Sequence, residues 1–92
     1  SEAKINEKSI DKRFKEAEDA LLKAIDGEKL SALELKHCAY IHLQLSTKEI
    51  AAAFHIEPKS VRVSKYRIKQ KLHLPKEIDL DNFLQTLVNN FQ

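Results

Sequence analysis

Residues 46–73 read STKEIAAAFHIEPKSVRVSKYRIKQKLH and contain two helix starts separated by a short turn. Ser46 and Glu49 have the three-residue spacing of a capping box, in which each side chain satisfies a backbone N–H group of the other. A short helix is therefore predicted to begin here and to end near Phe54. After three further residues, Pro58 can open a second helix, because the first helical position needs no backbone N–H. The segment predicts two helices joined by a turn of helix-turn-helix length.

The second predicted helix, over residues 58–73, has two contrasting faces. Val61, Ile68 and Leu72 recur at spacings of seven and four and form a line suited to burial. The opposite face carries cations, an amide, a phenol and one small apolar side chain: Lys59, Arg62, Val63, Tyr66, Lys69 and Gln70. Arginine and lysine contact phosphates and guanine edges, and an apolar group can meet a thymine methyl. This helix is therefore predicted to lie in the major groove of double-stranded DNA, with its N-terminal half toward the bases.

The formal net charge of +2 conceals an uneven distribution along the chain. Residues 58–76 contain seven basic side chains and no acidic one, whereas residues 77–92 contain three acidic side chains and no basic one. Because a basic run of this kind neutralises phosphates, it makes DNA binding salt-dependent. The run coincides with the second helix of the pair, which supports the prediction of DNA binding.

Two further helices are predicted before this pair. Ser31 and Glu34 form another capping box and begin a helix over residues 32–43. Its inward side is expected to hold Leu35, Cys38, Ala39 and His42. Residues 5–25 carry an amphipathic stripe made of Ile10, Phe14, Ala17, Leu21 and Ala24. We expect this first helix to end at about Asp26, because Gly27 follows and glycine favours the positive φ of a helix C-terminus.

A last helix is predicted from about Leu80, after the break at Pro75. Its apolar stripe is wide for the last 13 residues of a chain and comprises Leu80, Phe83, Leu84, Leu87, Val88 and Phe91. Such a stripe can cover the core of its own chain, form a homodimer seam, or do both, and its spacing favours none of these over the others.

The predicted fold is all-α. It comprises a tetrahelical helix-turn-helix bundle over residues 30–92 and, before it, an amphipathic helix and connector over residues 1–29. One Gly and two Pro in 92 residues leave few positions that interrupt helices, and this length supports one small domain. Because the chain starts at Ser1 and contains no Met, we expect it to be a piece of a longer protein.

The composition argues against an enzyme, a metal or cofactor site, and contact with a membrane. A single Cys excludes an internal disulfide and favours a reducing, cytoplasmic setting, and no apolar run approaches the roughly 18 residues of a membrane span. Cys38 and His42 lie four apart, with His37 beside the Cys, but a closed zinc site needs four ligands. We expect a buried thiol beside a boundary histidine, and no catalytic nucleophile.

Four blocks of the chain together resemble a known family: LSALEL at residues 30–35, LSTKEIA at 45–51, IEPKSVRV at 56–63 and YRIKQKL at 66–72. In this order they are similar to the LuxR/GerE-type helix-turn-helix of bacterial transcription regulators, over about residues 30–74. The closest likeness is to effector domains at the C-terminus of larger sensor-regulators. The resemblance implies a DNA-binding output domain with residues 58–73 as recognition helix, an upstream sensor domain, and a homodimer through the last helix.

By matching motif positions, the resemblance also implies individual contacts. Base edges would be approached by Arg62, Val63 and Tyr66. Phosphates would be approached by Lys48, Lys59, Ser60, Lys65, Arg67 and Lys69. The dimer seam would comprise Phe83, Leu84, Leu87, Val88 and Phe91. His55 and His73 stand where the family often has glycine, and histidine is among the few other residue types that tolerate positive φ.

Two alternatives fit the same residues. One is a helical protein-interaction or dimerisation module that uses residues 10–25 and 80–91, with the basic helix incidental. The other is the promoter-reading last region of a sigma factor, which is similar in fold.

Overall fold

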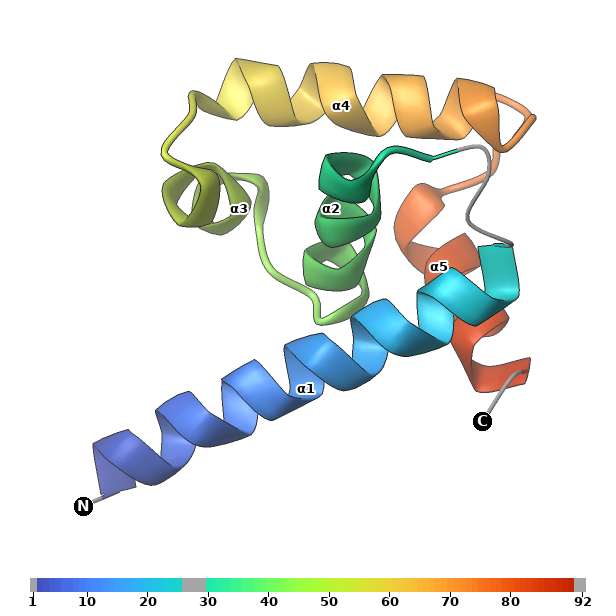
Figure 1. Ribbon diagram of the computed structural model, residues 1–92. Helices are drawn as coiled ribbons and strands as arrows, with labels where there is room; N and C mark the ends of the chain where they lie inside the picture. Colours follow the sequence, from blue (N-terminus) through green and yellow to red (C-terminus); the bar gives the residue numbers. More distant parts are fainter. Residues whose placement is uncertain (1, 26–29, 91–92) are drawn as a thin grey trace.

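The computed structural model describes the backbone of residues 2–25 and 30–90, and within these ranges the side chains from residue 11 onward. The described residues form five helices and no strand (Figure 1): α1 (Glu2–Ile25), α2 (Ala32–His42), α3 (Thr47–Phe54), α4 (Pro58–Lys71) and α5 (Leu80–Asn90). The predicted all-α fold is confirmed. The predicted first-helix end at Asp26 and Gly27, the side chain of Ile10 and the residue Phe91 lie outside the described part of the chain.

The helix starts follow the signals in the sequence. In α2 the Ser31 N–H donates to Glu34 Oε1 at 2.8 Å, and the Glu34 N–H donates to Ser31 Oγ at 3.1 Å. The equivalent pair at the start of α3 has the same two distances. The helix ends differ slightly from the prediction: α2 ends one residue early and α4 ends at Lys71. Gln44 and His73, just beyond these ends, have positive φ, which cannot continue a right-handed helix.

The helices are arranged around α2. In Figure 1, α4 lies along one side of the molecule and α1 along the opposite side, with α2 between them. α3 adjoins the N-terminal end of α4, and α1 packs against both α2 and α5. One side of α4 therefore faces the interior, and the other faces away from the rest of the chain.

All five helices contribute to one hydrophobic core. Its buried members are Ala17, Leu21, Leu30, Leu35, Cys38, Ala39, Ile41, Ile50, Ala51, Val61, Ile68, Leu80, Leu84 and Val88. Ala17 and Leu21 of α1 belong to this same cluster, and the ring of Phe14 in α1 packs at a tilt against that of Tyr40 in α2, with centroids 4.5 Å apart. The first helix is thus packed into the bundle, so the division between residues 1–29 and 30–92 stays a prediction.

His37 is buried, although the stripe predicted for its helix did not include it. The side chain is only 1% exposed and stacks on Phe54 of α3, with ring centroids 4.4 Å apart. His37 Nδ1 lies 2.9 Å from the Leu33 carbonyl oxygen, which can only accept, so Nδ1 carries the proton. His42 is half-buried at the edge of the core, as expected for a boundary histidine.

Candidate nucleic-acid interface

The turn between α3 and α4 is closed by two backbone hydrogen bonds. His55 has φ 57° and ψ 43°, in the left-handed region, as its position in place of glycine predicted. Its N–H donates to the Ala52 carbonyl at 3.3 Å, and the Ile56 N–H donates to the Ala51 carbonyl at 3.0 Å. This pattern is a Schellman motif, which ends α3 sharply and leaves room for Pro58 to begin α4. The chain therefore turns within three residues, and the two helices cross and pack against each other.

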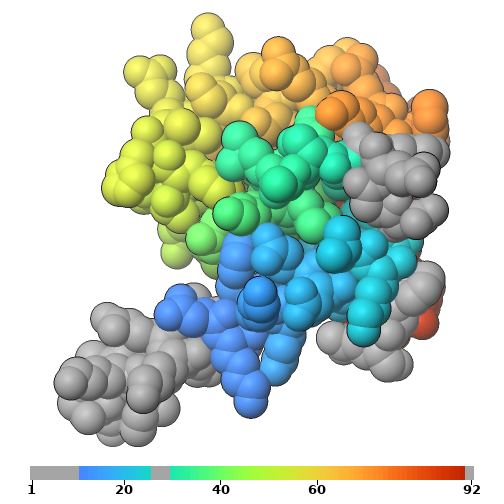
Figure 2. Space-filling model, in the orientation of Figure 1, coloured from blue at the N-terminus to red at the C-terminus, as the bar shows by residue number. Residues whose placement is uncertain are grey.

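The outward face of α4 is exposed, as the helical spacing predicted. Val61 and Ile68 are completely buried and fix the rotation of the helix about its axis. On the opposite face Val63 is 42% and Tyr66 is 63% exposed, although both are large hydrophobic side chains of the kind usually buried in a core. Lys59, Arg62 and Gln70 are exposed beside them, and Lys69 is half-buried. The side chains of α4 stand out along one edge of the molecule in Figure 2.

The cations of α4 fall into two groups according to their contacts. Lys65 Nζ donates to Thr47 Oγ1 at 3.2 Å and so links α4 to α3. Lys69 Nζ donates to the Lys76 carbonyl at 3.2 Å and links α4 to the segment after it. Lys59 and Arg67 are exposed, as are Ser60 and, on α3, Lys48. Apart from the half-buried Lys65 and Lys69, the residues expected to contact bases and phosphates are therefore exposed, and their contacts with DNA stay a prediction.

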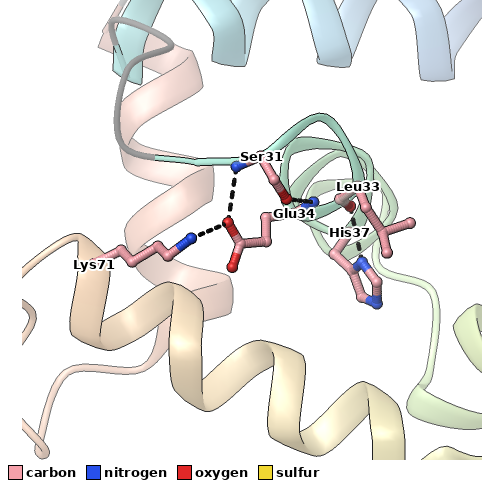
Figure 3. Close-up of polar contacts among 5 residues, drawn as sticks. All are labelled: Ser31, Leu33, Glu34, His37 and Lys71. Carbon is pink, nitrogen blue, oxygen red and sulfur yellow. Dashed lines mark hydrogen bonds and ion pairs between the residues drawn. The ribbon is translucent and has the colours of Figure 1, made fainter.

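Lys71 is oriented away from this surface by an ion pair. Figure 3 shows its ammonium directed at Glu34, with an Nζ to Oε1 distance of 2.7 Å. Partial burial of the Glu34 carboxyl raises its pKa, but the hydrogen bonds from Lys71 and Ser31 outweigh this effect, so that the pKa lies below its usual value. Glu34 therefore caps α2 and joins it to the C-terminal end of α4.

A hollow lies where the C-terminal half of α4 meets the segment leading to α5. It has a volume of about 390 Å³ and is lined by Tyr66, Lys69, Gln70, Leu74 and Lys76. The sequence had placed Tyr66, Lys69 and Gln70 on one helix face, but gave no role to Leu74 or Lys76. Lys76 is the last cation of the acid-free run at residues 58–76, and membership of this run is the one sequence feature that could have indicated a role for it.

The last helix uses most of its apolar stripe within the chain. Leu80, Leu84 and Val88 are buried in the core, and Phe83 and Leu87 are partly buried against it. Of the residues expected to form a dimer seam, only Phe83 and Leu87 are thus partly accessible among the described residues. The homodimer seam stays a prediction; Phe91, its remaining member, lies outside the described part of the chain.

Three other features of the described residues bear on function: the Cys38 thiol, the possible metal ligands and the apolar character of the helices. Burial raises the pKa of the Cys38 thiol to about 12, with a smaller contribution from the negative charge of Glu34, so the group stays protonated and unreactive near neutral pH. Within the same residues, no three His, Cys, Asp or Glu side chains lie close enough together to hold a metal ion. None of the helices described is long and apolar enough to cross a membrane.

A short pair of crossed helices, the second exposing an acid-free basic face, defines the class of helix-turn-helix DNA-binding domains. This chain belongs to the luxR family of bacterial regulatory proteins, because residues 28–81, more than half of it, match the GerE model of that family. The match spans α2, α3 and α4 and ends at the start of α5. It confirms the resemblance identified from the sequence, and DNA binding and transcription regulation follow from the family. No curated protein and no solved structure matches the chain.

Proposed function

We propose that the chain is the sequence-specific DNA-binding output domain of a bacterial transcription regulator, with α4 as its recognition helix in the major groove. The exposed face of α4 carries this proposal: Arg62, Val63 and Tyr66 lie outward on a helix whose rotation is fixed by Val61 and Ile68. An exposed valine and tyrosine among cations have no role in the core, but they suit base edges and thymine methyl groups.

The groups around this face match the two phosphate strands that border a major groove. At about 100° per residue, Lys65 and Lys69 lie on one flank of the Arg62–Val63–Tyr66 face, and Ser60 and Arg67 lie on the other. Lys48 and Lys59 add charge at the end of α4 that is nearer α3. An α-helix with its side chains is about 10–12 Å wide, which the major groove of about 12 Å admits. Phosphate contacts on both flanks would hold the helix in register.

Two further parts of the proposal concern the assembly. A homodimer formed through Phe83 and Leu87 of α5 would place two recognition helices on a two-fold related site. The chain would act in the cytoplasm, and an upstream sensor domain would supply the signal. α1 would connect that domain to the bundle, against which α1 packs through Phe14, Ala17 and Leu21.

A fluorescence-anisotropy titration of the 92-residue chain with labelled duplexes tests the DNA-binding proposal. One probe is a random-sequence pool, and the other is a duplex enriched from that pool by repeated selection on the chain. We expect the logarithm of the binding constant to fall with the logarithm of salt concentration with a slope of about −4.5, since each of the five cations proposed to contact phosphates contributes about −0.9 and the neutral Ser60 adds nothing.

Two variants separate base contacts from phosphate contacts. Arg62→Ala is expected to reduce the preference for the selected duplex by about 1–3 kcal/mol, and Lys48→Ala to weaken both probes alike. Lys15→Ala, at an exposed position of α1 on the opposite side of the molecule, is the matched control and should change neither. No binding by the parent chain at low salt, or equal effects of Arg62→Ala on both probes, would contradict the proposal.

A further inference from the structure

The hollow at the C-terminal end of α4 is held in shape by the backbone around it. The Leu74 N–H donates to the Lys69 carbonyl at 3.0 Å, and the His73 N–H donates to the Gln70 carbonyl at 3.1 Å. Lys69 Nζ then reaches across to the Lys76 carbonyl at 3.2 Å. The first two bonds hold the residues after α4 against the end of the helix, and the third links Lys69 to Lys76 across the hollow. Its volume of about 390 Å³ falls in the range of roughly 300–1,000 Å³ that small-molecule sites occupy.

The lining combines an apolar wall with groups that bind an anion. Leu74 and the ring of Tyr66 supply carbon surface, and Lys69 and Lys76 supply two ammonium groups. Gln70 Nε2 donates to the Tyr66 hydroxyl at 3.2 Å. Because this hydroxyl already accepts, its own O–H remains to be donated, and the second N–H of Gln70 is also available. Three kinds of donor thus surround an apolar surface.

The hollow is continuous with the proposed recognition face. Tyr66 belongs to both, and Lys69 lies on one flank of that face while forming part of the hollow. A helix rises about 1.5 Å per residue, so Gln70 lies about 12 Å along the axis from Arg62, beyond the half of α4 that would contact bases. Apart from Tyr66, which is also assigned to the base edges, the lining residues lie beyond that half, so a group bound here would be the DNA backbone beside the contacted bases.

We propose that the hollow formed by Tyr66, Lys69, Gln70, Leu74 and Lys76 binds one deoxyribose-phosphate unit of the DNA backbone, at the edge of the segment contacted by α4. The apolar wall receives the sugar, and the ammonium, phenol and amide groups receive the phosphate. Lys76, outside α4, becomes a phosphate contact in addition to those on the helix. The inference rests on the proposed DNA binding and adds to it the residues after the recognition helix.

The test is the variant Lys76→Ala in the same anisotropy titration, with Lys15→Ala as the control for loss of one positive charge. Lys76 is exposed, and the alanine variant keeps the backbone carbonyl that Lys69 contacts, so the fold should be retained. We expect the salt slope to become less negative by about 0.9 and both the random and the selected duplex to lose the same fold in affinity. Lys15→Ala should leave the slope unchanged.

A second measurement separates the DNA backbone from a free anion. In ¹H–¹⁵N spectra of the chain, the Gln70 side-chain amide and the Lys76 backbone amide should shift on addition of duplex, and inorganic phosphate at millimolar concentration should leave them unmoved. Shifts with phosphate but none with duplex would overturn the inference in favour of a free anion site. If the chain binds duplex and Lys76→Ala behaves as Lys15→Ala does, the inference fails while the proposed function stands. If the parent chain binds no duplex, both fail.

Discussion

At the scale of single residues, three helices end on a left-handed residue that is not glycine. Gln44, His55 and His73 have φ of 68°, 57° and 56°. Each closes a Schellman motif, with the following N–H bonded to a carbonyl five residues back, at Tyr40, Ala51 and Lys69 respectively. The resemblance marked two of these positions, because His55 and His73 stand where the family often has glycine and histidine tolerates positive φ, but nothing marked Gln44.

His55→Gly is expected to stabilise the chain. The left-handed conformation costs a residue with a Cβ about 1–2 kcal/mol, and the greater freedom of glycine in the unfolded chain offsets about 0.5–1 kcal/mol of that gain. The free energy of unfolding in urea should therefore rise by about 0.5–1 kcal/mol. Ala52→Gly, at an exposed position inside α3, is the control and should lower the same quantity by about 1 kcal/mol. A loss of stability in His55→Gly would contradict the assigned backbone conformation.

At the scale of helices, α2 is the central element and joins the others. Leu35, His37, Cys38, Ala39 and Ile41 are all buried, so the helix is enclosed on more than one side. This explains why a single predicted stripe missed His37: the buried residues of α2 cover a wider arc of the helix than one stripe, although Leu33 and Lys36 remain exposed. Its N-terminal end is tied to α4 through Glu34 and Lys71, and near its C-terminal end the amide of Gln85 in α5 donates to the His42 carbonyl.

The Glu34 contacts make stability depend on pH in the acid range. The pKa of this carboxyl is lowered in the folded chain, so its contribution is complete above the unfolded value of 4.5 and is lost as pH falls through the folded pKa. We expect the free energy of unfolding to decrease below about pH 4.5. Glu34→Gln should diminish that decrease and cost below about 1 kcal/mol at pH 7, because Lys71 is partly exposed and a glutamine can still complete the capping box.

Glu49→Gln is the matched comparison for this experiment. Glu49 forms the same capping box, with the Ser46 backbone hydrogen bond lowering its pKa first, but the structure gives it no lysine partner among the described residues. Chemical denaturation of both variants between pH 3 and 7 separates the ion pair from the cap. Identical pH profiles for the two variants would show that the Lys71 contact contributes nothing measurable.

At the scale of the whole molecule, the question is how α5 divides its apolar surface between the core and a second chain. Leu84 and Val88 are fully buried, which leaves Phe83 and Leu87 at the edge of the core. If the proposed homodimer forms through these two residues, Leu87→Asp should change sedimentation of the complex with the selected duplex from two chains per duplex to one. In the dimer, the carboxylate of the Leu87→Asp variant would be buried in the interface without a positively charged partner, which disfavours association.

Thr86→Asp is the control, because it places the same charge at an exposed position on the same helix. It should retain two chains per duplex. Circular dichroism of Leu87→Asp at the temperature of the sedimentation experiment tests whether the variant monomer is folded. One chain per duplex in the parent protein would contradict the homodimer.

Much of the fold could be predicted because its signals are local. Capping boxes act over three residues, and apolar spacing of three and four defines a helix face, so helix starts, the bihelical turn and the burial of Val61 and Ile68 follow from neighbours in the chain. The resemblance of four blocks in a fixed order indicated the luxR family, and the family match over residues 28–81 confirms it.

The tertiary structure alone decided what depends on residues far apart in the chain. The contacts of Lys65 with Thr47 and of Lys71 with Glu34 span 18 and 37 residues, and they determine which cations of the basic run are linked to other helices. The enclosure of His37, the burial of Leu84 and Val88 on the inner side of α5, and the hollow lined by Tyr66 and Lys76 likewise arise from how separate elements pack. The sequence by itself determined where the helices lie and which class of domain they form, since each helix is specified by residues that are close together in the chain. Tertiary packing determined which side chains remain exposed on the proposed DNA-binding surface, because the burial of a side chain depends on contacts with residues far away in the sequence.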